Sequence, residues 1–207
     1  MDLEVQHEHD HISRDKNELD VAIIHYKEML RINPDHADAH NNLGVVYHCH
    51  GAVDLAIAEY KEAIRISSEH ANAHNNLGAA YYAQNEIDLA VIEFDKALSI
   101  DPSLSQPHYN LGIAFKTQGK LDLALMELEI AQSLKPEDAD TYYIFGEVYL
   151  IKGNVEKAVE SYQKFIELAP PEDAYLIGEI QESIKQLKVR NFMDPELQLN
   201  EAIAGYG

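Results

Sequence analysis

The segment Ala37–His70, ADAHNNLGVVYHCHGAVDLAIAEYKEAIRISSEH, sets a pattern that most of this 207-residue chain repeats. The clearest marker is a glycine that returns every 34 residues, at Gly44, Gly78, Gly112 and Gly146. A period of 34 residues is typical of a unit made of two antiparallel helices, many of which stack into a solenoid. The sequence therefore predicts an all-α repeat protein.

The same register carries further bulky and small residues. An aromatic residue follows each glycine by three positions, at Tyr47, Tyr81, Phe115 and Tyr149. An alanine and a second bulky residue recur later in the unit, at Ala56, Ala90, Ala124 and Ala158 and at Tyr60, Phe94, Leu128 and Tyr162. A glycine inside a helix costs about 0.8 to 1 kcal/mol relative to alanine. We therefore expect these glycines to allow a close approach between the two helices of a pair.

The repeat register divides the chain. Four complete units are expected at residues 37–70, 71–104, 105–138 and 139–172, preceded by a half-repeat at 17–36, within a solenoid spanning 17–172. The flanking segments are expected to be a polar, histidine-rich stretch at 1–16, a capping helix at 173–189 and a C-terminal tail at 190–207. The capping helix is predicted because a terminal repeat needs a polar outer face.

By its Leu-Gly pairs (Leu43-Gly44, Leu77-Gly78 and Leu111-Gly112), its aromatics, its alanines and its closing prolines, the chain resembles the tetratricopeptide repeat family. The resemblance implies a right-handed superhelical solenoid of antiparallel helix pairs that serves as a protein-interaction scaffold and not as an enzyme. One departure stands out, since His40, His74 and His108 occupy a position where the family usually has a bulky aromatic.

The resemblance also implies a concave groove, lined by the first helix of each pair, that binds an extended peptide or a partner helix. The residues expected to bind a peptide there are Asn41, Asn42, Asn75, Asn76, Tyr82, Tyr109, Asn110, Lys116, Tyr143 and Glu147. The asparagines at 42, 76 and 110 are similar to the asparagine ladder in the repeat domain of O-linked N-acetylglucosamine transferases. An amide both donates and accepts, so it can match a peptide group. The alternative is that these asparagines only keep an exposed face soluble.

Charge and cysteine content restrict the partners. The net charge of −20, from 36 acidic and 16 basic residues, argues against nucleic acid and anionic membranes, whose phosphates need a basic face. A neutral or basic protein or peptide partner is expected. The single cysteine, Cys49, and the lack of a secretory leader or a long apolar run favour a reducing, cytoplasmic location.

Metal and catalytic chemistry have weak support in the sequence. His7, His9 and His11 alternate with acidic residues and could hold a transition metal, which leaves open a metal-linked accessory protein. Cys49 lies between His48 and His50, but no motif for nucleophilic catalysis accompanies it. We expect no catalytic residue, no resident metal and no cofactor. A self-assembling scaffold is the remaining alternative, in which the solenoid accepts a second copy of the chain.

Overall fold

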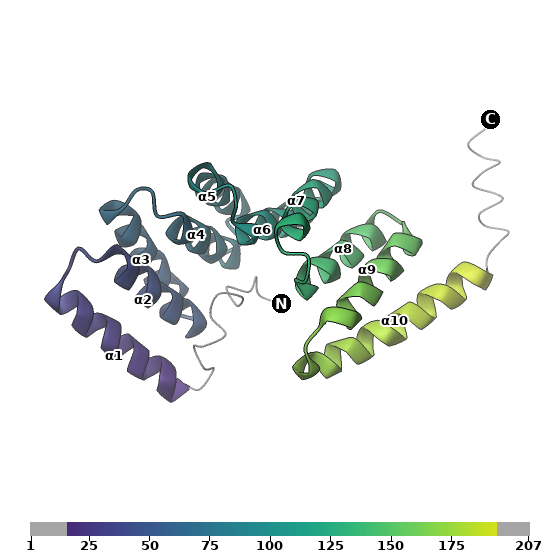
Figure 1. Cartoon of the computed structure of the whole chain (residues 1–207), viewed down its shortest axis with the longest axis horizontal. Helices are drawn as coiled ribbons and strands as arrows, with labels where there is room; N and C mark the ends of the chain where they lie inside the picture. The colour runs from purple at the N-terminus through teal and green to yellow at the C-terminus, as the bar shows by residue number, and fades with distance from the viewer. Residues whose placement is uncertain (1–15, 194–207) are drawn as a thin grey trace. The chain divides into compact units, whose positions relative to one another are not determined.

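The computed structural model describes residues 16–193, which form ten α-helices and one short 3₁₀ helix and contain no strand (Figure 1). The chain is all-α, as the sequence predicted. It divides into two compact units after Leu134, and each unit is described by itself. The N-terminal histidines at 7, 9 and 11 and the tail beyond Met193 lie outside the described residues.

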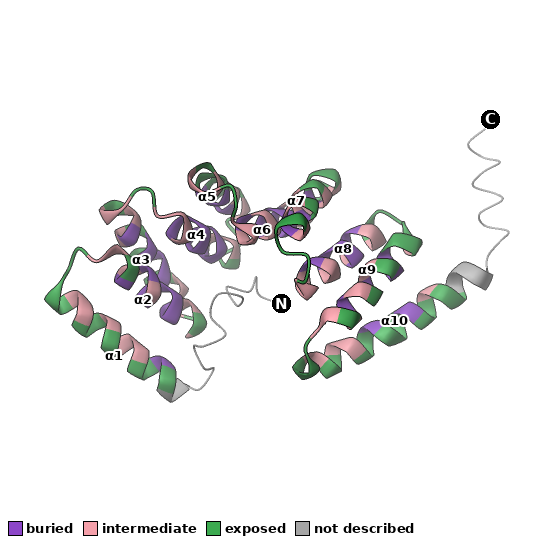
Figure 2. Ribbon diagram, viewed as in Figure 1, coloured by how far each residue is buried: buried purple, intermediate pink, exposed green. Residues whose placement is uncertain are grey.

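The first unit contains a single helix followed by three helix pairs. Its helices are α1 (Lys16–Ile32), α2 (Ala37–Cys49), α3 (Val53–Ile66), α4 (Ala71–Ala83), α5 (Ile87–Ile100), α6 (Ser105–Thr117) and α7 (Leu121–Leu134). The pairs α2/α3, α4/α5 and α6/α7 match the units expected from the 34-residue period. Buried residues gather where the helices of each pair face one another (Figure 2).

The second unit contains α8 (Ala139–Ile151), α9 (Val155–Leu168), a 3₁₀ turn (Pro171–Asp173) and α10 (Ala174–Met193). Ile180 and Ile184 of α10 are buried against Val159, Tyr162 and Phe165 of α9. The helix expected at 173–189 is therefore present, and it continues four residues into the segment expected to be a tail. Its apolar stripe covers the last helix pair of this unit.

The turn inside each pair needs a left-handed backbone conformation. That position is Gly51, Gly119 and Gly153 in three repeats, with φ between 73° and 78°, and Asn85, with φ 63°, in the other. The amide after it donates back to the aromatic position of the first helix, as Ala52 N does to Tyr47 O at 2.8 Å and Glu86 N to Tyr81 O at 2.9 Å. These bonds satisfy carbonyls that the helix end would leave unpaired.

The repeated glycines lie at the closest contact inside each pair. A β-carbon built on Gly78 would stand 2.6 Å from a ring carbon of Phe94 and 3.1 Å from the carbonyl oxygen of Ala90. Gly44 faces Tyr60 in the same way, and Phe94 and Tyr60 are fully buried. The predicted reason for the glycines, a close helix approach, is what the structure shows.

We expect Gly78→Ala to lower the melting temperature. Alanine would improve helix propensity by about 1 kcal/mol, but displacing the Phe94 ring from a packed core costs about 1 to 3 kcal/mol. Gly178 of α10 is the matched control, because a β-carbon there would meet no atom within 4 Å. Gly178→Ala should leave the melting temperature unchanged or raise it. Equal melting shifts in the two variants, measured by circular dichroism, would contradict the packing explanation.

The Tyr60 hydroxyl is buried and has no hydrogen-bond partner among the described residues. Burial, with a smaller contribution from the nearby Cys49, raises the pKa of Tyr60 well above its ordinary value, so the hydroxyl stays protonated. The equivalent residue of the next repeat is Phe94, which carries no polar atom. An unpaired buried hydroxyl costs about 1 to 3 kcal/mol.

Tyr60→Phe should therefore stabilise the protein by about 1 kcal/mol or more. The check is chemical denaturation followed by helical circular dichroism, with the slope of the transition unchanged between the two proteins. A loss of stability in Tyr60→Phe would mean that the hydroxyl has a partner in solution.

Candidate functional site

Five asparagines on α2, α4 and α6 form one continuous chain of side-chain hydrogen bonds, which we call the amide ladder. Bonds between repeats join Asn110 Nδ2 to Asn75 Oδ1 at 2.9 Å and Asn76 Nδ2 to Asn41 Oδ1 at 3.0 Å. Within a repeat, Asn75 Nδ2 donates to Asn76 Oδ1 at 3.5 Å and Asn41 Nδ2 to Asn42 Oδ1 at 3.3 Å. Every bond donates in the direction of Asn42, from Asn110 at the other end, so the ladder has a direction.

The ladder is mostly buried. Asn41, Asn75, Asn76 and Asn110 are between 2% and 9% exposed, whereas Asn42 is half-buried. Buried amides are stable only when they are hydrogen-bonded, and here most of them satisfy one another. The exception is Asn110 Oδ1, which is buried without a partner among the described residues. The ladder thus ends in an unpartnered acceptor on α6 and a half-buried amide on α2.

This arrangement differs from the simple ladder expected from the sequence, which used one asparagine per repeat. In the structure Asn42, Asn76 and Asn110 belong to one hydrogen-bonded chain, but they are connected only through Asn41 and Asn75. The sequence signal for this role was the Asn-Asn doublet at 41–42 and again at 75–76. The inter-repeat bonds span 35 residues, one more than the period, so equal positions never bond directly.

The other expected groove residues are divided between the two units. In the first unit, the Tyr82 hydroxyl lies 2.7 Å from the Thr117 hydroxyl, and Tyr109 and Lys116 are half-buried on α6. In the second unit, Tyr143 packs against Tyr162 with ring centroids 6.0 Å apart. Burial and the neighbouring Glu147 carboxylate raise the pKa of Tyr143. The expected residues that lie together in one unit are therefore those on α2, α4 and α6.

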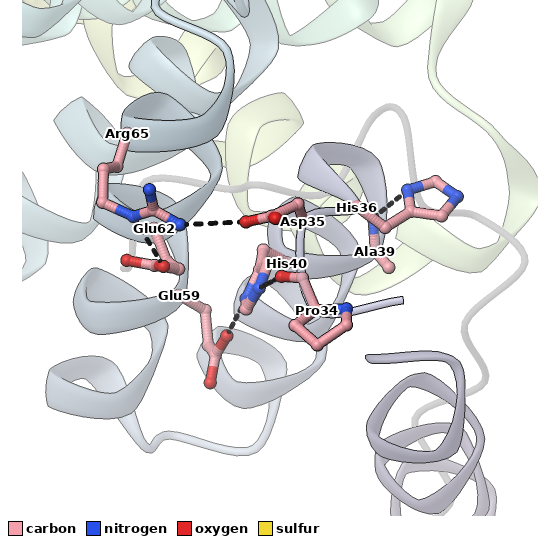
Figure 3. A network of polar contacts seen from close by, with 8 residues as sticks. All are labelled: Pro34, Asp35, His36, Ala39, His40, Glu59, Glu62 and Arg65. Carbon is pink, nitrogen blue, oxygen red and sulfur yellow. Dashed lines mark hydrogen bonds and ion pairs between the residues drawn. The ribbon is translucent and has the colours of Figure 1, made fainter. Parts of the chain in front are cut away.

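A second repeated feature, which the sequence reasoning missed, lies between the two helices of each pair in the first unit. Three histidines bring Nδ1 to 2.7 Å from a glutamate Oε2 nineteen positions later, in His40–Glu59, His74–Glu93 and His108–Glu127. Figure 3 shows the first of these, where His40 Nε2 also lies 3.0 Å from the carbonyl oxygen of Pro34. Each pair fastens the first helix of a repeat to the second.

The last repeat replaces this pair. Tyr142 occupies the histidine position and donates its hydroxyl to the Pro136 carbonyl at 3.0 Å, while Ser161 stands where the glutamate would be. The contact to the preceding turn is kept and the histidine–glutamate contact is lost. The histidines thus take over part of the role of the family's aromatic residue, and the 19-residue His-to-Glu spacing was the signal that could have revealed it.

Two further histidines, His36 and His70, have structural roles. His36 and His70 cap α2 and α4, because their Nδ1 atoms accept from the amides of Ala39 at 3.3 Å and Ala73 at 3.2 Å (Figure 3 shows the first). The described residues contain no group of three or more histidine, cysteine, aspartate or glutamate side chains placed to hold a metal. Between residues 16 and 193 there is also no helix long and apolar enough to span a membrane.

We expect the His74–Glu93 pair to be energetically coupled. His74→Phe leaves a buried glutamate with only its contact to Lys96 at 2.8 Å, and should destabilise the protein by about 1 to 3 kcal/mol. His74→Phe combined with Glu93→Leu should recover part of that loss, because neither polar partner then remains. The control is the same double-mutant cycle at the exposed pair Lys164–Glu167, where no measurable coupling is expected. Equal coupling at both pairs in denaturation experiments would contradict this role.

Comparison with known families identifies the class of protein. Family profiles described as "TPR repeat" match residues 11–51, 50–85 and 78–119, and one described as "Tetratricopeptide repeat" matches 109–173. These matches together span residues 11–173, well over half of the chain. The chain belongs to the tetratricopeptide repeat family.

Solved structures of the same fold are similar over most of their length. A MamA structure is 28% identical, with a TM-score of 0.64, and the match covers 74% of this chain and 90% of that one. YrrB, described as a TPR protein with an unusual peptide-binding site, is 26% identical with a TM-score of 0.61 over 79% and 84% of the two chains. TTC0263, a thermophilic TPR protein of Thermus thermophilus, shares the fold at 20% identity, a TM-score of 0.69 and coverage of 84% and 92%. A search of curated proteins found no match.

Proposed function

We propose that this chain is a non-enzymatic scaffold that binds an extended peptide across the face formed by α2, α4 and α6. Tetratricopeptide repeats generally mediate protein–protein interactions, and the similar protein YrrB is described as having an unusual peptide-binding site. The observation that carries the proposal for this chain is the amide ladder. It places a row of amides along the first helices of three successive repeats.

The ladder retains hydrogen-bonding capacity beyond its internal bonds. An asparagine amide has two N–H donors and two acceptor lone pairs, and each inner member uses only one donor and one acceptor on its neighbours. Packed helices lie about 8 to 10 Å apart and an extended chain advances about 3.3 to 3.6 Å per residue. One repeat therefore corresponds to about three ligand residues, which suits a strand-like or polyproline-like peptide.

The direction of the ladder gives the ligand an orientation. All four bonds donate toward Asn42, so this end of the ladder presents the amide N–H groups of Asn42, while the other end is Asn110 Oδ1, an unpartnered acceptor that is buried. Hydrogen bonds in a chain polarise one another, which strengthens both ends. A peptide carbonyl is the complementary group at Asn42, and the net charge of −20 favours a neutral or basic peptide.

The test uses a library of extended peptides, neutral and basic, followed by fluorescence polarisation on those that bind. Asn42→Ala should weaken binding by about 0.5 to 1.5 kcal/mol, the net value of one hydrogen bond, and should lower the melting temperature less than the loss of an inner member, because only Asn41 Nδ2 loses its acceptor. Ser99→Ala on α5 is the control, since it removes an exposed hydroxyl from a helix outside the ladder face. Full affinity in Asn42→Ala would place recognition elsewhere.

Buried members of the ladder should behave differently from Asn42. Asn76→Ala removes a partner from two other amides and leaves them unpaired in the interior. It should lower both the melting temperature and peptide affinity, by about 1 to 3 kcal/mol in stability. A peptide with N-methylated backbone amides gives a check that needs no variant, because a ligand held through its backbone should then bind more weakly.

A further inference from the structure

The outward side of the second helices in the first unit carries exposed apolar residues in the register of the repeat. We call this set the outer stripe, and it consists of Leu55 on α3, Leu89 and Ile92 on α5, and Leu123 and Met126 on α7. These side chains are between 41% and 51% exposed. Leu55, Leu89 and Leu123 are 34 residues apart, so they occupy the same place in three stacked repeats. Val21 of α1, 66% exposed, continues the row.

The fold does not require apolar residues at these positions. The core face of α5 is supplied by Ala90, Phe94 and Ala97, all fully buried, while Leu89 and Ile92 lie on the opposite side of the helix. In the last repeat the equivalent positions are Lys157 and Glu160, so the position accepts charged residues. A single exposed leucine is ordinary, but an apolar residue kept at the same exposed position in three successive repeats points to an interaction surface.

The border of the outer stripe is acidic. One helical turn after Ile92 and Met126 lie Asp95 and Glu129, both exposed and both without a cationic partner among the described residues. Partial burial, and to a smaller extent the nearby Glu127 of α7, raise the pKa of Asp95. Two copies of a chain with a net charge of −20 would repel at this border. A basic partner would be attracted to it.

We propose that the outer stripe docks an amphipathic helix of a partner protein, with leucine- or isoleucine-like anchors on one side and lysine or arginine flanking them. An amphipathic helix binds through apolar anchors three, four or seven positions apart on one side, and the outer stripe offers apolar side chains on successive repeats to meet them. This surface belongs to α3, α5 and α7, and is separate from the amide ladder on α2, α4 and α6.

The test uses a fluorescein-labelled 18-residue helical peptide of leucine and lysine, with leucines at seven-residue spacing, and fluorescence anisotropy with the full chain. The variant that changes Leu89, Ile92, Leu123 and Met126 to serine should bind it roughly tenfold or more weakly. The matched control changes Ile151 and Tyr175, 61% and 78% exposed in the second unit, to serine and should bind as the wild type does. A peptide with glutamate in place of lysine should not bind.

Charge reversal gives a second variant that leaves the apolar residues in place. Asp95→Lys with Glu129→Lys should weaken binding of the leucine–lysine peptide, and raising the salt concentration should do the same. Asn42→Ala should leave this binding unchanged, which separates the outer stripe from the proposed peptide site. Equal affinity of the four-serine variant and the wild type overturns the proposal. Sedimentation of the wild type as a dimer that the four-serine variant dissociates would also overturn it, because the occupant would then be a second copy.

Discussion

Each helix pair closes around a glycine, and the missing β-carbon is what lets a ring or branched side chain of the second helix lie against the backbone of the first. The clearance is small, since a β-carbon at Gly44, Gly78 or Gly112 would stand 2.6 Å from Tyr60, Phe94 or Leu128. The polar contacts of each pair depend on this close approach of its two helices, because it sets the distance that the His–Glu pairs span. Local packing inside one repeat thus determines the surface that successive repeats present.

The helix pairs and their boundaries were predictable, because hydrophobic period, glycines and turn residues are local signals that recur. The polar systems were only partly predictable. The His–Glu pairs form between two helices, so predicting them requires knowing how far apart those helices lie. In the sequence the only sign of the pairs is a spacing of nineteen residues. The amide ladder was seen at Asn42, Asn76 and Asn110, but its inter-repeat bonds link unequal positions of successive repeats. A search restricted to equal positions therefore finds the members and misses the connections.

The first unit has two chemically different faces made by alternate helices. The first helices carry buried and half-buried amides, whereas the second helices carry exposed leucines with an acidic border. Because repeat units stack, a residue that recurs at the same position of successive repeats forms a row on the surface of the unit. The last repeat has Tyr143 and Ile144 at the ladder positions and Lys157 and Glu160 at the leucine-bearing ones, so it does not continue either face in the same form.

The amide ladder also constrains the orientations of its five side-chain amides jointly. Turning over one of its inner asparagines would set oxygen against oxygen on one side and N–H against N–H on the other. The five side chains must consequently share one orientation or exchange it together. The orientation of the Asn42 amide on α2 is therefore tied to that of Asn110 on α6, two repeats away, through side-chain hydrogen bonds alone.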